Sequence, residues 1–263
     1  SRRIKLRCAI MDDLLSSSST LALCAGFISH RMLLATAGQG GGYVISQSIR
    51  FNDDDSAYMY RTPGSAGNRK KGTLSAWVKR CELGALNYIF GVANGANEDI
   101  LRFNADDTLE FRINATSSIT SSAKYRDPSA WYHIVVRWDF ANTTWDMYVN
   151  GIEIVYAVAN TPANADIAIF NTVEHRIARA PTGTALTADL YLAEFIMLDG
   201  QFLDPTSFGE FDANGVWVPI AYAGTYGTNG FRITGEDNST AAALGTDYSG
   251  NSNTFTVSGL TTA

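Results

Sequence analysis

The sequence predicts an all-β protein built as an antiparallel β-sandwich. Three observations favour this fold: hydrophobic and polar residues alternate along many short segments, turn residues separate these segments at regular spacing, and no long stretch keeps helical periodicity. The composition agrees, because 11% of the residues are aromatic and 23 are glycine, whereas only 6 are proline. With 46% hydrophobic residues, the 263-residue chain can bury a large core.

Residues 1–42 differ from the rest of the chain. They are rich in Ser and Leu and end in "GQGGG", which is typical of a flexible joint, so we expect an N-terminal arm or linker. Residues 1–31 hold five basic and two acidic side chains, a net charge of +3, and the other 232 residues carry a net charge of −9. Asp12, Asp13 and four serines interrupt the order of basic and apolar residues that a secretion signal requires.

Several functional classes conflict with the composition. An acidic body is a poor nucleic-acid binder, because phosphate contacts dominate that affinity. No run approaches the length of about 20 apolar residues needed to cross a membrane, so we expect no membrane insertion. Cys8, Cys24 and Cys81 are odd in number and lack CxxC spacing, which disfavours a disulfide framework and a zinc site.

From Tyr43 onward the pattern is that of a sheet. In "TLEFRIN", Leu109, Phe111 and Ile113 share one face, and "ILRF" precedes this strand across the turn "NADD", which predicts a hairpin. "WYHIVVRW" is a second strand with β-branched residues at its centre. "TWDMYVNG" alternates again, with Trp145, Met147 and Val149 on one face and Asp146, Tyr148 and Asn150 on the other.

Three further segments continue the series of strands: "ADIAIF", "DLYLAEFIML" and "GFRITG". A short helix is expected in "LDPTSFGEF", where Asp204 suits the N-cap and Pro205 the first helical position. Many strands with no βαβ alternation and very little helix predict an antiparallel sandwich.

The segment "WYHIVVRWDFANTTWDMYVNGIEI" resembles the signature of laminin-G-like domains in the concanavalin A-like lectin/glucanase superfamily. In those domains a Trp-x-His strand runs into a hairpin and returns as a strand ending in Tyr-Val-Asn-Gly. "TLSAWVKR" and "DLYLAEFIMLDGQFLDPTSFGEF" resemble an early core strand and a later strand with its short helix. The resemblance implies a concanavalin A-like jelly-roll sandwich over residues 43–235, followed by a loop-rich C-terminal extension at 236–263.

A narrower likeness concerns "SIRFNDDDSAYMYRTPGSAGNRKKGTLSAWVKR", "GEFDANGVWVPIAYAGTYGTNGFRI" and "GTDYSGNSNTFTVSGL". Together they resemble bacteriophage virion proteins, associated with tails or fibres, that carry this domain. The likeness implies a place on the virion and other virion proteins as partners. In that group the chain usually continues past the equivalent of "SGLTTA", so a further segment is expected there.

The resemblance to this superfamily raises the possibility of a β-glucanase. Retaining glycosidases need two carboxylates about 5 Å apart, and the glucanases supply them from a Glu-x-Asp-x-x-Glu strand. The nearest match is "GEFDANG", with Glu210 and Asp212, but Gly215 stands where the second glutamate should be. His133 lies inside a strand and is interpreted as a hydrogen-bonded structural histidine. We therefore expect no enzymatic activity.

Two loops raise the question of a cation. "GTDYSGNSN" places side-chain oxygens at Asp247, Asn251 and Asn253, and alternate oxygen ligands around a flexible glycine can hold Ca²⁺. The alternative is an Asx-turn loop, in which the same side chains bond their own backbone. The three consecutive aspartates of "FNDDDSAY" allow the same two interpretations, a cation ligand set or a solvated turn.

Glycan binding requires a flat aromatic ring for the apolar face of a sugar and polar groups nearby for its hydroxyls. Tyr148, Tyr156 and Trp217 are the candidate rings, with sheet packing as the alternative for each. The sequence favours a non-enzymatic virion protein of the tail, fibre or capsid surface that adheres to host surface polysaccharide and forms homo-oligomers, which gain avidity. A secreted bacterial lectin-like module and a polysaccharide depolymerase are the alternatives.

Overall fold

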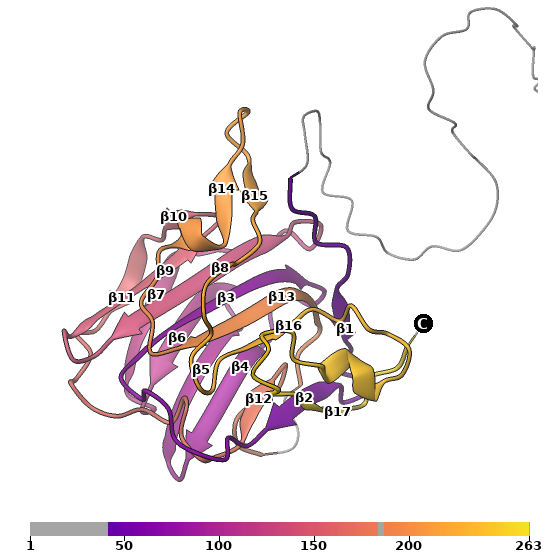
Figure 1. Cartoon of the computed structure of the whole chain (residues 1–263). Coiled ribbons are helices and arrows are strands. Elements are labelled where there is room, and N and C mark those ends of the chain that lie inside the picture. Colours follow the sequence, from indigo (N-terminus) through magenta and orange to yellow (C-terminus); the bar gives the residue numbers. More distant parts are fainter. Residues whose placement is uncertain (1–41, 184–186, 263) are drawn as a thin grey trace, which may run out of the picture. The chain divides into compact units, whose positions relative to one another are not determined.

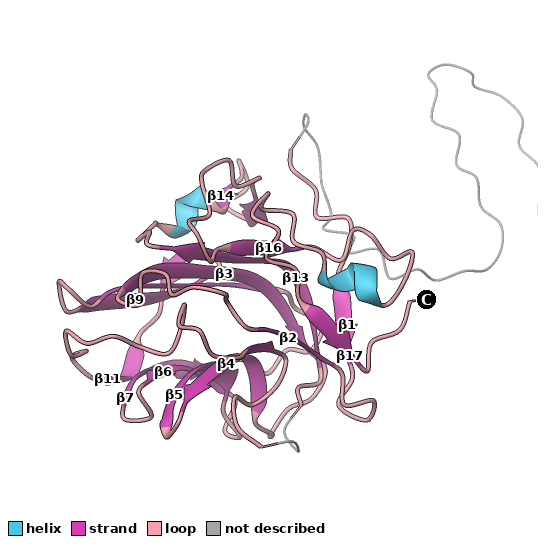
Figure 2. Ribbon diagram, turned by 60° about the horizontal axis from the view of Figure 1, so that its bottom comes forward, coloured by secondary structure: helices cyan, strands magenta, loops and turns pink. Residues whose placement is uncertain are grey.

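The structure, a computed structural model, describes residues 42–183 and 187–262, and nearly all of the arm expected at 1–42 lies outside them. Within these ranges two antiparallel sheets pack face to face, as the side view in Figure 2 shows. This confirms the all-β sandwich that the sequence predicts. No helix in the described ranges has the length and apolar character needed to cross a membrane.

The first sheet has seven strands among the described residues. In order they are β1 (Ile49–Phe51), β13 (Leu190–Asp199), β3 (Lys71–Arg80), β8 (Tyr132–Asp139), β9 (Thr144–Val149) and β10 (Ile152–Glu153). The seventh strand, β16 (Phe231–Ile233), also pairs with β13, beyond a bulge at Glu194 where the backbone φ is 47°.

The second sheet has eight strands within the same ranges. Their order is β11 (Tyr156–Ala159), β7 (Ser117–Lys124), β6 (Thr108–Ile113), β5 (Asn97–Phe103), β4 (Asn87–Asn94), β12 (His175–Ile177), β2 (Tyr58–Arg61) and β17 (Thr256–Ser258). A separate hairpin of β14 (Gly209–Phe211) and β15 (Trp217–Pro219) projects from the sandwich in Figure 1. Two short 3₁₀ helices, η1 (Pro205–Ser207) and η2 (Ala242–Gly245), lie in the connections.

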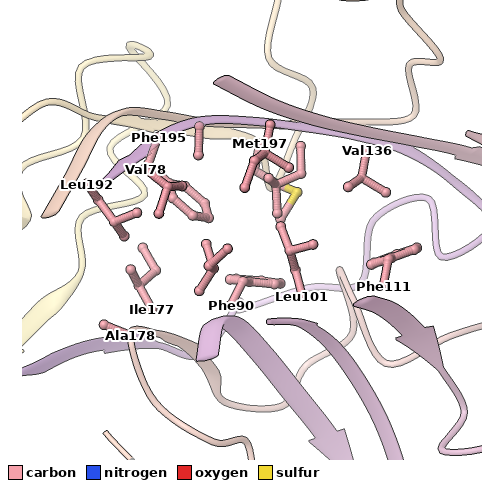
Figure 3. Packing of buried hydrophobic residues seen from close by; sticks show 14 of the residues in the cluster. Val78, Phe90, Leu101, Phe111, Val136, Ile177, Ala178, Leu192, Phe195 and Met197 are labelled. Atoms are coloured by element: carbon pink, nitrogen blue, oxygen red, sulfur yellow. The ribbon is translucent and has the colours of Figure 1, made fainter. Parts of the chain in front are cut away.

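The core lies between the facing sheets and follows the alternation read from the sequence. Leu109, Phe111 and Ile113 of β6 are buried in it, as are Trp145 and Met147 of β9. Figure 3 shows how side chains from the two sheets meet, among them Phe90, Phe111, Phe195 and Met197. The hairpin of β5 and β6 also forms as predicted.

The segment "ADIAIF" (residues 165–170) was expected to be a strand and is a buried irregular turn instead. Its hydrophobic side chains enter the core, but its backbone N–H groups have no neighbouring strand. The buried carboxylate of Asp99 takes that role, because its Oδ2 accepts hydrogen bonds from the N–H groups of Ala168 and Ile169. Burial raises the pKa of Asp99 to about 6, although hydrogen bonds from three backbone N–H groups lower it.

The helix expected after Asp204 is a single 3₁₀ turn, and the Asp204 side chain does not cap it. The Asp204 carboxylate pairs instead with the guanidinium of Arg137 on β8. The C-terminal segment is rich in loops, and it ends in β17, which pairs with β2, while Phe255 and Leu260 are buried in the core. These residues are therefore packed into the sandwich.

Candidate functional site

A groove of about 410 Å³ lies on the outer face of the seven-stranded sheet, beside the β14–β15 hairpin. Strand β3, the residue before β8, the turn between β9 and β10, the start of β10, and the hairpin all contribute to it. Its lining consists of Trp77, Trp131, Asn150, Ile152, Phe211, Gly215, Val216 and Trp217. Four of these eight residues are aromatic, and none is charged.

The alternation of β3 and β8 brings the first two rings to this face. Ala76 and Val78 of β3 point into the core, so Trp77 between them points outward. Trp77 is in register with His133 of β8. Trp131 precedes His133 by two residues and therefore lies on the same face of the sheet as His133. The Trp131 ring is half-buried and meets the edge of Tyr191, with the ring centroids 6.5 Å apart.

Trp217 of the hairpin completes a stack of three rings. The His133 imidazole lies 4.7 Å from Trp77 and 5.9 Å from Trp217, centroid to centroid, with both pairs inclined by 21°. Trp217 Nε1–H donates to His133 Nδ1 over 2.9 Å, so the histidine proton is on Nε2, which lies 2.9 Å from Oγ of Ser75. Burial lowers the pKa of His133 to about 3, so the ring is neutral at physiological pH.

Two glycines allow the hairpin to approach the sheet. A Cβ on Gly151 would lie 2.3 Å from the Trp217 ring, and a Cβ on Gly209 would lie 2.5 Å from it. Gly151 also has a positive φ of 77°, which disfavours other residues. The Trp217 indole thus packs directly against the backbone at Gly151 and Gly209.

The rim of the groove is apolar and open to solvent. Phe211, Val216 and Ile152 are 51%, 53% and 64% exposed. The Phe211 ring stands edge-on against Trp217 with centroids 4.9 Å apart, so the indole supports it. Exposed apolar side chains gathered around a preformed groove mark a binding surface.

Asn150 supplies the polar side chain of the lining. Its backbone N–H donates to the carbonyl of His133, and its Oδ1 accepts the N–H of His133, both over 2.8 Å. The second bond fixes the carboxamide, and Nδ2 donates no hydrogen bond within the described part of the chain. The fixed amide is therefore a donor available to a molecule in the groove.

Comparison with known proteins identifies the family. The family model of the concanavalin A-like lectin/glucanases superfamily, of laminin-G type, matches residues 52–191, just over half of the chain. The chain belongs to this superfamily. The family resemblance seen in the sequence is thereby confirmed, whereas the likeness to phage virion proteins stays a prediction. No curated protein matches this superfamily member.

Solved structures similar to this superfamily member include three of different origin. The heptameric SAP-like pentraxin from Limulus polyphemus is 16% identical (TM-score 0.46), over 59% of this chain and 76% of the pentraxin. Domains LG4-5 of the mouse laminin α1 chain are 13% identical (TM-score 0.45), over 75% of this chain and 49% of theirs. The CBM40 of Ruminococcus gnavus IT-sialidase, bound to α2,3-sialyllactose, is 12% identical (TM-score 0.39), over 56% and 89%.

Only one of the three aromatic rings that the sequence suggested for glycan binding lines the groove. Trp217 lines the groove, but Tyr148 and Tyr156 do not. The Tyr148 hydroxyl accepts a hydrogen bond from Arg137, whose guanidinium lies over the tyrosine ring. The Tyr156 hydroxyl accepts the N–H of Met147 and donates to Glu153. The hydroxyl groups of both tyrosines are thus hydrogen-bonded within the protein.

The C-terminal loop of the predicted calcium site is held by its own hydrogen bonds. Oδ1 of Asp247 accepts the backbone N–H groups of Arg232 and Ser249, and Oδ2 accepts the Ser249 hydroxyl and the Asn253 N–H. The amides of Asn251 and Asn253 donate to backbone carbonyls of residues 227–230. This geometry supports the Asx-turn alternative, and Ca²⁺ binding stays a prediction.

Other acidic residues considered in the sequence lie apart from the groove lining. Asp212 accepts the backbone N–H groups of Asn214 and Val216 and so forms the tip of the hairpin, while Glu210 is exposed on β14. The Asp53 carboxylate accepts the N–H of Asp54 in an exposed turn. In the described ranges, no cluster of three or more His, Cys, Asp or Glu residues could hold a metal ion.

Proposed function

We propose that this superfamily domain is a non-enzymatic glycan-binding module that works on the surface of a bacteriophage virion. The aromatic groove carries the proposal for binding. Indole and phenyl rings pack against the apolar C–H face of a pyranose, and a fixed amide donor meets its hydroxyls. Trp77, Trp131 and Phe211 provide the rings and Asn150 the donor.

The lining also supports a role without catalysis. Most glycosidases hydrolyse their substrate with two carboxylic groups that flank the glycosidic bond, and the residues that line the groove include no Asp or Glu. Carboxylates elsewhere on the sheet faces are held by arginines: Asp146 by Arg137, Glu110 by Arg102 and Glu194 by Arg232. A carboxylate paired in this way is a poor nucleophile or proton donor.

The virion setting rests on the likeness of three sequence segments to phage tail and fibre proteins. On a particle, many copies of a weak site act together, so homo-oligomers attached to other virion proteins gain avidity for host surface polysaccharide. A secreted lectin-like module would use the same groove without a particle. Gold-labelled antibodies against the chain distinguish the two: label on purified virions supports the proposal, and label confined to the soluble fraction contradicts it.

Binding and catalysis are separated by two measurements on the full chain. A glycan array should show retention of polysaccharides, and incubation with each retained polysaccharide should release no reducing ends. Release of sugar would establish a depolymerase. Binding to no glycan would contradict the proposal and leave the apolar groove as a contact surface for another virion subunit.

A further inference from the structure

We infer that the groove selects uncharged polysaccharide and that the Nδ2 amide of Asn150 is its specificity-determining donor, an inference that rests on the proposed function. The lining has seven apolar or glycine residues and one carboxamide. No Lys or Arg is among the lining residues. A sugar carboxylate placed against this lining would lose its hydration without gaining an ion pair.

The charged residues near the groove also disfavour an acidic sugar. Glu153 follows Ile152 on β10, and Glu210 and Asp212 flank Phe211 on the hairpin. Glu153 and Glu210 are exposed, and Asp212 is partly buried. Lys79 lies further along the same face of β3, in register with Tyr191, and is outside the lining. Within two residues of the lining in sequence there are thus three acidic side chains and one lysine, a balance that disfavours an acidic polymer.

The position of Asn150 explains why a neutral sugar is held in one orientation. Its Oδ1 accepts the His133 N–H, which fixes the amide and leaves its Nδ2 group as a donor. A hydroxyl or ring oxygen can accept from this amide while the sugar's apolar face packs on Trp77 and Trp131. A fixed donor of this kind disfavours a ligand that presents no acceptor to it, because the amide would be left without a partner.

The replacement Asn150→Asp tests the donor with little change of shape. Asp tolerates the positive φ of 50° at this position and keeps the oxygen that accepts the His133 N–H. The amide donor becomes a carboxylate oxygen. We expect the dissociation constant for the tightest neutral polysaccharide to rise about tenfold, with thermal unfolding close to that of the wild type. An unchanged dissociation constant would overturn the role of Asn150.

The replacement Val216→Lys tests the charge preference without touching Asn150. Val216 is exposed at the rim, and its contacts with Asp212 are made by its backbone. The full-length wild type and variant are compared on an array carrying neutral glucans, mannans and galactans beside polysialic acid, hyaluronan and polygalacturonate. We expect the wild type to retain neutral polymers only and the variant to gain salt-sensitive binding of the acidic ones.

The outcomes separate this inference from the proposed function. Retention of an acidic polymer by the wild type as strongly as any neutral one would overturn the selection for uncharged sugars and leave glycan binding intact. Retention of no polymer at all would overturn both. A Val216→Lys variant with no gain for acidic polymers would show that the rim charge does not control selection.

Discussion

The indole Nε1 of Trp217 donates a 2.9 Å hydrogen bond to Nδ1 of His133, and 84 residues separate the two in sequence. Both partners are buried, so this bond ties the β14–β15 hairpin to the outer face of the seven-stranded sheet. It also sets the histidine tautomer and holds the indole that supports Phe211 at the rim. The shape of the groove therefore depends on this contact.

Trp217→Phe should destabilise the protein and loosen the hairpin. The replacement removes the donor and leaves the buried Nδ1 of His133 without a partner, which costs about 1–3 kcal/mol. Urea denaturation of the variant measures the change in the free energy of unfolding. Phe211→Leu is the control, because Phe211 is half-exposed and donates no hydrogen bond from its side chain. A Trp217→Phe variant as stable as the control would contradict the structural role of the bond.

The stability of the fold should decrease as the pH is lowered from 6.5 to about 4. Burial lowers the pKa of His133 to about 3 and that of His175 to about 4. In this pH range both histidines are therefore protonated in the unfolded chain and largely neutral in the folded chain, so unfolding takes up about two protons. Asp99 opposes them below pH 6, because its raised pKa makes the folded chain take up one proton first. The net effect is about one proton, or about 1.4 kcal/mol per pH unit.

Urea denaturation at pH 6.5 and at pH 5.0 measures this slope. Asp99→Asn should make it steeper, because the opposing proton uptake is removed. The variant should also be less stable at both pH values, because one of the two oxygens that accept backbone N–H groups is lost. Equal stability at both pH values, or greater stability at pH 5.0, would show that the two buried histidines do not control the acid response.

Asp107→Asn should be among the most destabilising single changes in the second sheet. Asp107 accepts hydrogen bonds from Arg80, whose side chain is fully buried, from Arg126 and from the backbone N–H of Gly84. Burial would raise the pKa of Asp107, but these donors outweigh it and lower the pKa to about 2. Removing the charge leaves the Arg80 guanidinium buried without an anion, which costs about 3 kcal/mol or more.

The neighbouring residue provides a matched control for that change. Asp106 is exposed and its carboxylate bonds Thr108 of the same turn. Asp106→Asn should therefore leave the denaturation midpoint close to that of the wild type. A midpoint for Asp107→Asn that equals the Asp106→Asn midpoint would show that the buried ion pair contributes little.

Chelation distinguishes the two interpretations of the C-terminal loop. If Asp247 serves its own backbone, EDTA should leave the melting temperature unchanged, whereas Asp247→Ala should lower it because four hydrogen bonds are lost. Differential scanning calorimetry with and without EDTA measures both effects. A fall in the melting temperature on EDTA treatment, restored by added Ca²⁺, would establish a cation in this loop.

The strands of the sandwich could be predicted because their faces differ. Neighbours such as Phe111 and Arg112, or Met147 and Tyr148, point to opposite sides of a sheet. The sequence shows this as alternation of hydrophobic and polar residues. The strand prediction for "ADIAIF" was wrong because residues 167–170 are buried without pairing to a strand. The N–H groups of Ala168 and Ile169 bond instead to Asp99, about 70 positions away in the sequence. A hydrophobic run does not show how its N–H groups are bonded.

The groove could be predicted only in part. Trp217 was a candidate ring, but its partners come from three separated elements, and only strand pairing brings Trp77 to His133 and hence beside Trp131. Alignment of "SAWVKR" with "WYHIVV" in one sheet would have placed these two tryptophans on one face. The contribution of Phe211 and Asn150 depends on the docking of the hairpin against Gly151, which the sequence pattern does not specify.

The most direct test of glycan binding at the groove compares the affinities of three forms of the full chain for the polysaccharide retained on the array. Isothermal titration calorimetry is applied to the wild type, to Trp131→Ala, which removes a half-buried ring from the lining, and to Tyr58→Ala, which removes a half-buried ring from the other sheet. We predict that Trp131→Ala weakens binding at least about tenfold and that Tyr58→Ala leaves it unchanged. Equal affinity of Trp131→Ala and the wild type would contradict a glycan site in this groove.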